Sequence, residues 1–91
     1  MFFVVSYDIP VDKRRNKIMR IMKDYGQRVQ YSVFEANLDD KQMAALRKEL
    51  KKVIIEKEDS VRIYTLCGAC VAKVEMLGRG ELTTDPEVYI V

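Results

Sequence analysis

One carboxylate in this chain lies where metal chemistry is easily placed. Asp8 follows an apolar, β-rich run at residues 2–7 and precedes Pro10, so we expect it at the exposed end of a strand. A single carboxylate is a poor Mg²⁺ site, because such sites combine one or two carboxylates with phosphate oxygens and waters. Two copies of Asp8 facing each other across a dimer axis would make a better one. The spacing leaves open the alternative that Asp8 only caps the turn or the helix that follows.

A strongly basic segment comes directly after Asp8. Residues 13–28 contain seven Lys/Arg against one Asp, a local charge of +6, in a chain whose net charge is +2. Such a cluster indicates a surface for phosphate groups, although a solvated helix face is the ordinary alternative. Two of the arginines would fall in the first turn of a helix, where the helix dipole disfavours cations unless an anion compensates. We therefore expect a nucleic-acid-binding surface made of Lys13, Arg14, Arg15, Lys17 and Arg28.

The residue types that are absent narrow the chemistry further. The chain has no histidine, which excludes a Ser-His-Asp triad and most sets of zinc ligands. Any catalysis must rest on carboxylates, cations, tyrosines or a metal ion. Cys67 and Cys70 form a lone CxxC, which offers two of the four ligands that a zinc site needs. We expect two reduced thiols there, because residues 71–77 give no helical pattern of the kind that a thioredoxin-like motif requires.

The elements that must position these residues alternate between strand and helix. The spacing predicts a strand at residues 2–7 and a helix that ends at Tyr25, with Asp12 as its N-cap and Gly26 as its C′ glycine. A β-rich stretch at 28–38 should bend or bulge near Ser32. A capping box of Asp39 and Gln42 then opens a second helix. Further strands are expected at 61–66 and 88–91.

This order is β-α-β-β-α-β with an additional C-terminal strand, the ferredoxin-like α+β arrangement, in a single domain spanning 1–91. Both helices would cover one face of the sheet. We expect a homodimer that buries the other face, since small chains often gain stability by oligomerising. No run approaches the ~20 apolar residues that span a bilayer, and the N-terminal segment has no signal-peptide pattern. We therefore expect no membrane partner and a cytoplasmic location.

Three motifs carry a family resemblance. They are Tyr7-Asp8-Ile9, the helix start at 12–18, and the block from Tyr25-Gly26-x-Arg28 to Ser32-Val33-Phe34-Glu35. Together they resemble the small Cas2 proteins of CRISPR systems. The resemblance implies a ferredoxin-like homodimer whose sheets pack face to face, with the C-terminal tail at 75–91 reaching the partner.

The same resemblance implies a role in spacer acquisition, in which the dimer joins the Cas1 integrase and holds duplex DNA. It also implies metal-dependent endonuclease activity on single-stranded RNA or double-stranded DNA. The position of Asp8 is assigned to Mg²⁺, with Mn²⁺ as a substitute. Taken as residues alone, Tyr7 and Phe34 are typical of a strand core and Ser32 of a bend. Residues that the resemblance associates with activity or nucleic-acid contact are Arg14, Arg15, Arg28, Tyr7, Ser32 and Phe34.

Three functions remain open at this point. In an endonuclease, a metal held by Asp8 would lower the pKa of a bound water that attacks a phosphodiester. In a non-catalytic adaptor, the basic helix would hold duplex DNA, the acidic stretch 75–91 would dock the integrase, and Asp8 would be dispensable. A ferredoxin-like regulatory domain is disfavoured, since the chain lacks a glycine-rich ligand loop.

Overall fold

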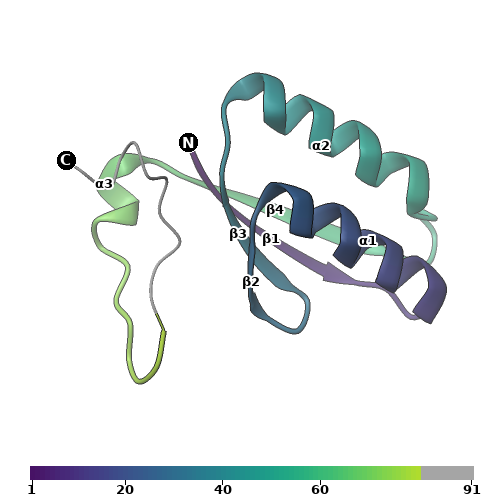
Figure 1. The fold of residues 1–91 in the computed structure, drawn as a ribbon, viewed down its shortest axis with the longest axis horizontal. Coiled ribbons are helices and arrows are strands. Elements are labelled where there is room, and N and C mark those ends of the chain that lie inside the picture. The colour runs from purple at the N-terminus through teal and green to yellow at the C-terminus, as the bar shows by residue number, and fades with distance from the viewer. Residues whose placement is uncertain (81–91) are drawn as a thin grey trace.

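The computed structural model describes residues 1–80 (Figure 1). The strand expected at 88–91 and most of the tail at 75–91 lie outside the described residues. The elements in chain order are β1 (Phe2–Asp8), α1 (Asp12–Tyr25), β2 (Gln27–Gln30), β3 (Val33–Asn37), α2 (Asp40–Val53), β4 (Ser60–Leu66) and α3 (Gly68–Val71).

The four strands form one sheet in the order β2-β3-β1-β4. The central strand β1 runs antiparallel to both of its neighbours, β3 and β4. This is the ferredoxin-like order, and the predicted fold class is confirmed. Because β1 is paired along both edges, the residue at its end, Asp8, is held by the sheet and lies opposite Ser60 of β4.

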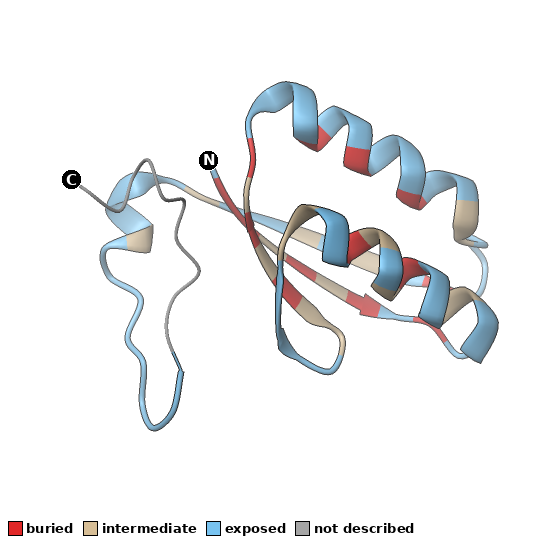
Figure 2. Cartoon of the chain, viewed as in Figure 1, coloured by how far each residue is buried: buried red, intermediate tan, exposed pale blue. Residues whose placement is uncertain are grey.

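Helices α1 and α2 lie side by side over one face of the sheet (Figure 1). Alternation along β1 sends Phe3, Val5 and Tyr7 toward the helices, where Figure 2 shows the buried positions facing one another. Each large apolar side chain fully buried here stabilises the fold by about 1.5–3 kcal/mol. The side chains that close this core from the other elements are Ile18, Met22, Phe34, Ala36, Leu38, Met43, Leu46 and Leu50.

The opposite face of the sheet has no helix over it within residues 1–80 (Figure 1). The alternate positions of β1, namely Val4, Ser6 and Asp8, belong to this open face, as does Tyr64 of β4 opposite Val4. Tyr64 is 50 % exposed, and Val29 of β2 is also exposed. In the part of the chain that the structure describes, no helix has the length and apolar character to cross a membrane.

The two long helices begin in different ways. The predicted N-cap of α1 was wrong: the cap is Val11, which makes no side-chain bond. Asp12 is the first helical residue, and its carboxylate is paired with Arg15 instead of with backbone N–H groups. The capping box of α2 is confirmed, since Asp39 Oδ1 accepts from the Gln42 N–H at 2.7 Å and Gln42 Oε1 accepts from the Asp39 N–H at 2.9 Å.

Gly26 ends α1 for a different reason from the one predicted. Its backbone is extended (φ −154°, ψ −163°), not left-handed. A Cβ at this position would lie 2.4 Å from the Glu35 carbonyl oxygen and 2.8 Å from the Ala36 Cβ. The chain therefore needs glycine here because β3 passes too close for any side chain.

The hairpin between β2 and β3 carries the predicted irregularity. The register shifts between Arg28 and Gln30, and Tyr31 and Ser32 form the turn. The Ser32 carbonyl oxygen accepts a hydrogen bond from the Tyr7 N–H at 3.0 Å, which ties the tip of the hairpin to the end of β1. This contact brings the hairpin tip to the same end of the sheet as Asp8.

Candidate functional site

Asp8 is exposed at the end of β1 and belongs to the open face. It lines an open depression of about 170 Å³ with Ser6, Tyr7, Ser60, Arg62 and Tyr64. Within residues 1–80, its carboxylate makes no side-chain hydrogen bond or ion pair, and the cap of α1 is Val11. The alternative that Asp8 is a capping residue of α1 is therefore ruled out, and its oxygens are available to a ligand.

The depression around Asp8 offers a metal ion one carboxylate. Among the described residues there is no group of three His, Cys, Asp or Glu side chains that could surround an ion. Asp8 nevertheless offers the hard oxygen donor that Mg²⁺ prefers, on a backbone paired with Ser60 of β4. The residues fit a metal site that a second carboxylate and substrate phosphates complete.

Arg62 is the residue of this depression that sequence reasoning missed. It lies opposite Ser6 in the register of β4 and β1, on the same face as Asp8. The polar–apolar alternation of Val61, Arg62 and Ile63 was the available signal, since it places the guanidinium on the face away from the helices. A cation in the same depression as Asp8 would attract the negatively charged phosphate groups of a substrate.

A second, smaller pocket lies between α1 and the β2–β3 hairpin, with a volume of about 110 Å³. Four of the predicted site residues meet in it, namely Tyr7, Arg15, Arg28 and Ser32. Asn16, Met19 and Tyr31 complete its lining. Because Tyr7 and Asp8 are consecutive in a strand, their side chains lie on opposite faces, and the structure does not bring this pocket onto the open face that carries Asp8.

Tyr7 lines the pocket, and the Phe34 ring packs against it from inside the core. Their rings stack with centroids 6.3 Å apart and an interplanar angle of 26°. Phe34 is completely buried and does not line the pocket, so it supports Tyr7 and cannot touch a ligand as the resemblance implied. Burial raises the pKa of the Tyr7 hydroxyl, and the nearby charges of Arg28 and Arg15 offset part of that rise. At neutral pH the hydroxyl is protonated and serves as a hydrogen-bond donor.

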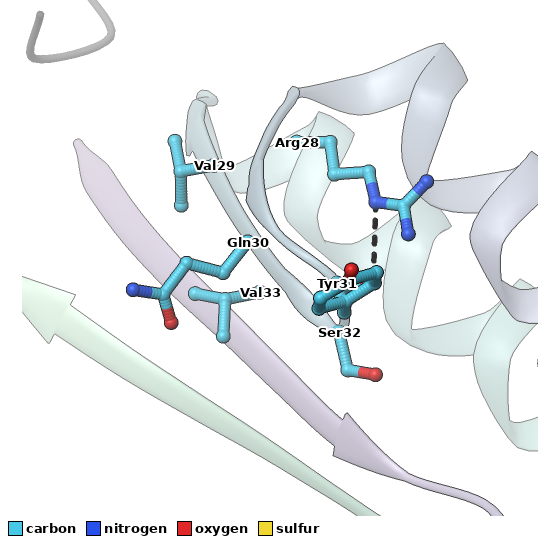
Figure 3. A pocket seen from close by; sticks show the side chains of 6 residues that line it. All are labelled: Arg28, Val29, Gln30, Tyr31, Ser32 and Val33. Atoms are coloured by element: carbon cyan, nitrogen blue, oxygen red, sulfur yellow. Dashed lines mark hydrogen bonds between the residues drawn. The ribbon is translucent and has the colours of Figure 1, made fainter. Parts of the chain in front are cut away.

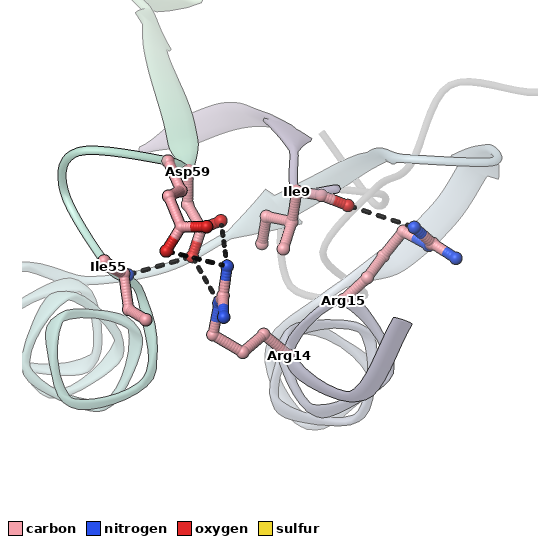
Figure 4. A network of polar contacts seen from close by, with 6 residues as sticks. Ile9, Arg14, Arg15, Ile55 and Asp59 are labelled. Atoms are coloured by element: carbon pink, nitrogen blue, oxygen red, sulfur yellow. Dashed lines mark hydrogen bonds and ion pairs between the residues drawn. The ribbon is translucent and has the colours of Figure 1, made fainter. Parts of the chain in front are cut away.

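Arg14 does not line this pocket and points toward Asp59 (Figure 4). Its Nε and Nη2 donate to the two oxygens of Asp59 at 2.8 and 2.9 Å, and Glu58 lies at 3.8 Å from Nη2. The Asp59 side chain is fully buried and also accepts from the Ile55 N–H at 2.9 Å. The hydrogen bond from Arg14 lowers the pKa of Asp59, and the same bond raises the pKa of Arg14.

The expectation that Arg14 needs a ligand anion was wrong. The anion that compensates its charge is Asp59 of the same chain, so no ligand is needed to explain an arginine at that position. Sequence reasoning missed Asp59 because the two residues are 45 positions apart. Arg15 differs, since Nη1 donates to the Ile9 carbonyl oxygen at 3.0 Å while the guanidinium also borders the Tyr7 pocket. Lys13, Lys17 and Arg28 are exposed.

Cys67 and Cys70 are both free and exposed, as expected. Residues 72–77 are not helical, in line with the expectation for 71–77, but Cys67 caps a short helical turn, α3, that the sequence pattern did not predict. The pKa of Cys67 is lowered, chiefly by the backbone N–H of Cys70 and then by its thiol. The pKa of Cys70 is raised by its hydrogen bond to Cys67.

Comparison with known proteins decides the family. The model of CRISPR-associated protein Cas2 matches residues 1–74. This chain belongs to the Cas2 family. The identification confirms the resemblance seen in the Tyr7-Asp8-Ile9 and Gly26–Glu35 motifs.

Similar Cas2 proteins cover almost all of the chain. One relative, from Chloroflexus aurantiacus, is named CRISPR-associated endoribonuclease Cas2 3; it is 46 % identical over 100 % of this chain and 98 % of its own length. The crystal structure of Streptococcus pyogenes Cas2 at pH 6.5 has a TM-score of 0.75 at 36 % identity, covering 86 % of this chain and 100 % of that one. A Cas2 chain in a partial Cas6-RT-Cas1–Cas2 complex has a TM-score of 0.73 at 26 % identity, covering 84 % and 89 %.

Proposed function

We propose that this chain is a metal-dependent endonuclease of CRISPR spacer acquisition, which hydrolyses phosphodiester bonds in RNA or duplex DNA. The observation that carries the proposal is Asp8: an exposed carboxylate without an intramolecular partner in residues 1–80, at the end of the central strand and beside Arg62. Relatives named as endoribonucleases and endonucleases support the reaction class.

The active form we propose is a homodimer that joins two open faces. The exposed ring of Tyr64, the exposed Val29 and the half-buried Val4 and Val33 give that face apolar surface to bury. Within residues 1–80, β4 is an edge strand, which is a template for a further strand. Joining the open faces would bring two Asp8 carboxylates toward one axis.

Each residue then has a defined part in the reaction. The bound Mg²⁺ or Mn²⁺ would supply a water of lowered pKa and would neutralise charge on the scissile phosphate. Asp8 of each copy holds the ion, because two carboxylates in proximity repel each other unless a cation lies between them. Arg62 attracts the phosphate on the same face. Arg15, Arg28, Lys13 and Lys17 hold the flanking backbone from the helix side.

The second candidate function is that of an adaptor without cleavage. The exposed cations Lys13, Lys17 and Arg28 favour it, because they suffice to hold a duplex without Asp8. The neighbouring structure with Cas1 supports a Cas1 integrase as the partner of this chain. As an endonuclease or as an adaptor, the protein would bind nucleic acid in the cytoplasm.

Asp8→Asn separates the two functions. The amide keeps the size of the side chain but is a weaker ligand, so we expect the variant to bind duplex DNA as wild type does and to lose cleavage of RNA and DNA. Cleavage by highly purified protein is measured with Mg²⁺, with Mn²⁺ and with chelator. Asp24→Asn, an exposed acid on α1, is the matched control and should cleave normally. Equal cleavage by wild type and Asp8→Asn contradicts the nuclease; binding without cleavage by wild type supports the adaptor.

A further inference from the structure

The most exposed aromatic ring among the described residues has no structural task that explains it. Tyr31 lies at the tip of the β2–β3 hairpin and is 86 % exposed. Aromatic side chains usually stabilise a protein by being buried, and an exposed ring in a turn does not do so. Figure 3 shows its ring beside the Arg28 side chain.

The hairpin holds this ring in place. Arg28 Nε donates to the Tyr31 carbonyl oxygen at 3.1 Å, and its guanidinium carbon lies 5.8 Å from the ring centroid. Arg28 Nη1 also reaches the Met19 sulfur at 3.5 Å, which ties the arginine to α1. The next residue, Ser32, is anchored to the Tyr7 N–H. With the guanidinium on one side and high exposure overall, the ring offers a prepared open surface to a planar ligand.

Directly beside the ring lies the 110 Å³ pocket that contains two guanidinium groups. Arg15 and Arg28 both line it, and both charges act on the Tyr7 hydroxyl. No lining residue is acidic, and the one acid paired with a lining arginine is Asp12, with Arg15. The pocket is therefore lined by two cations and by residues with hydroxyl groups, among them Tyr7 and Ser32, which is a set of groups that binds a phosphate.

We propose that Tyr31, Arg28 and Arg15 form a subsite for one unpaired nucleotide of a single-stranded nucleic acid. Its base stacks on the Tyr31 ring, and its phosphate lies between the two guanidinium groups. Bases of a duplex have both faces covered by their neighbours, so only an unpaired base can use the ring. The subsite extends the proposed function, since it gives this chain a preference for single-stranded segments that a basic surface alone would not provide.

The preference is tested by replacing the ring. Tyr31→Leu should weaken binding of a single-stranded oligonucleotide roughly 5- to 100-fold, as the loss of one stacked base does. Tyr31→Phe, which keeps the ring, should bind like wild type. An oligonucleotide that lacks bases over the bound stretch, and a blunt duplex, should bind Tyr31→Leu and wild type equally. All binding is measured by fluorescence anisotropy without divalent metal, so that cleavage does not interfere.

A direct readout of stacking is available because the chain contains no tryptophan. Tyr31→Trp introduces a single indole, whose fluorescence a stacked base quenches. The control is Ala44→Trp, at an exposed position of α2. We expect single-stranded RNA or DNA to quench the indole at 31 and to leave the indole at 44 unchanged. Equal quenching at both positions, or equal affinity of Tyr31→Leu and wild type, overturns the subsite.

These outcomes are distinct from those that test the nuclease. If wild type cleaves in an Asp8-dependent manner while Tyr31→Leu binds every oligonucleotide normally, the subsite is wrong and the proposed function stands. If wild type binds no oligonucleotide, both are wrong. Thermal unfolding of each Tyr31 variant should match wild type, because the side chain is solvent-exposed.

Discussion

Arg14 and Asp59 illustrate how a residue that looks functional can have a structural task. Their two charged hydrogen bonds connect α1 to the loop before β4, and the Asp59 side chain is completely buried. Removing one member of such a pair leaves the other charge without a partner, which is more damaging than removing an exposed charge. A variant of Arg14 that binds nucleic acid poorly must therefore be checked for stability before the residue is assigned to the binding surface.

The ion pair predicts a pH-dependent stability. Asp59→Asn should lower the melting temperature at pH 7 by about 5 °C or more. The hydrogen bond from Arg14 lowers the pKa of Asp59 in the folded protein below that of the unfolded chain, so its stabilising contribution is present above the unfolded pKa and is lost as the pH falls toward the folded pKa. The difference between wild type and Asp59→Asn should shrink as the pH is lowered below about 4.

Glu58→Gln is the control for this measurement. Glu58 is exposed and lies 3.8 Å from Arg14, so its replacement should leave the melting temperature nearly unchanged. Calorimetric or circular-dichroism melts from pH 7 to pH 3 provide the data. A constant difference between wild type and Asp59→Asn over that range would contradict the assigned pKa shift.

At the scale of elements, the α1–β2 junction is set by close packing. The Gly26 backbone passes so near to β3 that a methyl group would overlap the Glu35 carbonyl oxygen, at 2.4 Å. The hairpin that follows carries Arg28 and Tyr31. A displacement at Gly26 would therefore shift the hairpin and change the pocket between the hairpin and α1.

We expect Gly26→Ala to destabilise the protein by about 1–3 kcal/mol or more, because backbone atoms of β3 must move to admit the methyl group. Gly68→Ala is the matched control. Gly68 lies in α3 with nothing within 4 Å of an added Cβ, and alanine favours the helical conformation. Urea denaturation followed by circular dichroism measures both. Equal stability of the two variants would contradict the contact with Glu35.

At the scale of the whole molecule, one face of the sheet has no helical layer within residues 1–80. Asp8 and Arg62 lie at that face, whereas Tyr7, Arg15 and Arg28 line a pocket on the helix side. The two regions lie on opposite faces of the sheet at the same end of β1. A nucleic acid that follows this end of the sheet could contact both regions. The metal proposed at Asp8 and the arginines of the pocket would then act on the same ligand.

The dimer proposed above has a direct test. Wild type should sediment at about twice the chain mass of 10.6 kDa at micromolar concentration. Tyr64→Glu places a charge on the open face and should give a folded species near 10.6 kDa that has lost metal-dependent cleavage. Ala44→Glu, on the exposed side of α2, should remain dimeric. A monomeric wild type that still cleaves in an Asp8-dependent manner would rule out the shared metal site.

The sequence by itself determined the element order, the ferredoxin-like class and the family. These follow from local patterns: the apolar run before Asp8, the i, i+3, i+4 spacing within α1, and the capping box at Asp39 and Gln42. Each pattern reports on residues within a few positions of one another, where helical or strand geometry fixes their relation. The expected break near Ser32 is present as a turn at Tyr31 and Ser32, next to a register shift between Arg28 and Gln30.

Only the tertiary structure decided which side chains meet. Asp59 pairs with Arg14 across 45 positions, and Tyr7, Arg15 and Arg28 gather in one pocket although they come from three elements. The need for glycine at position 26 comes from β3 and not from the helix that it ends. Such contacts depend on the strand order and register of the sheet, because these bring distant segments together and choose the face for each side chain.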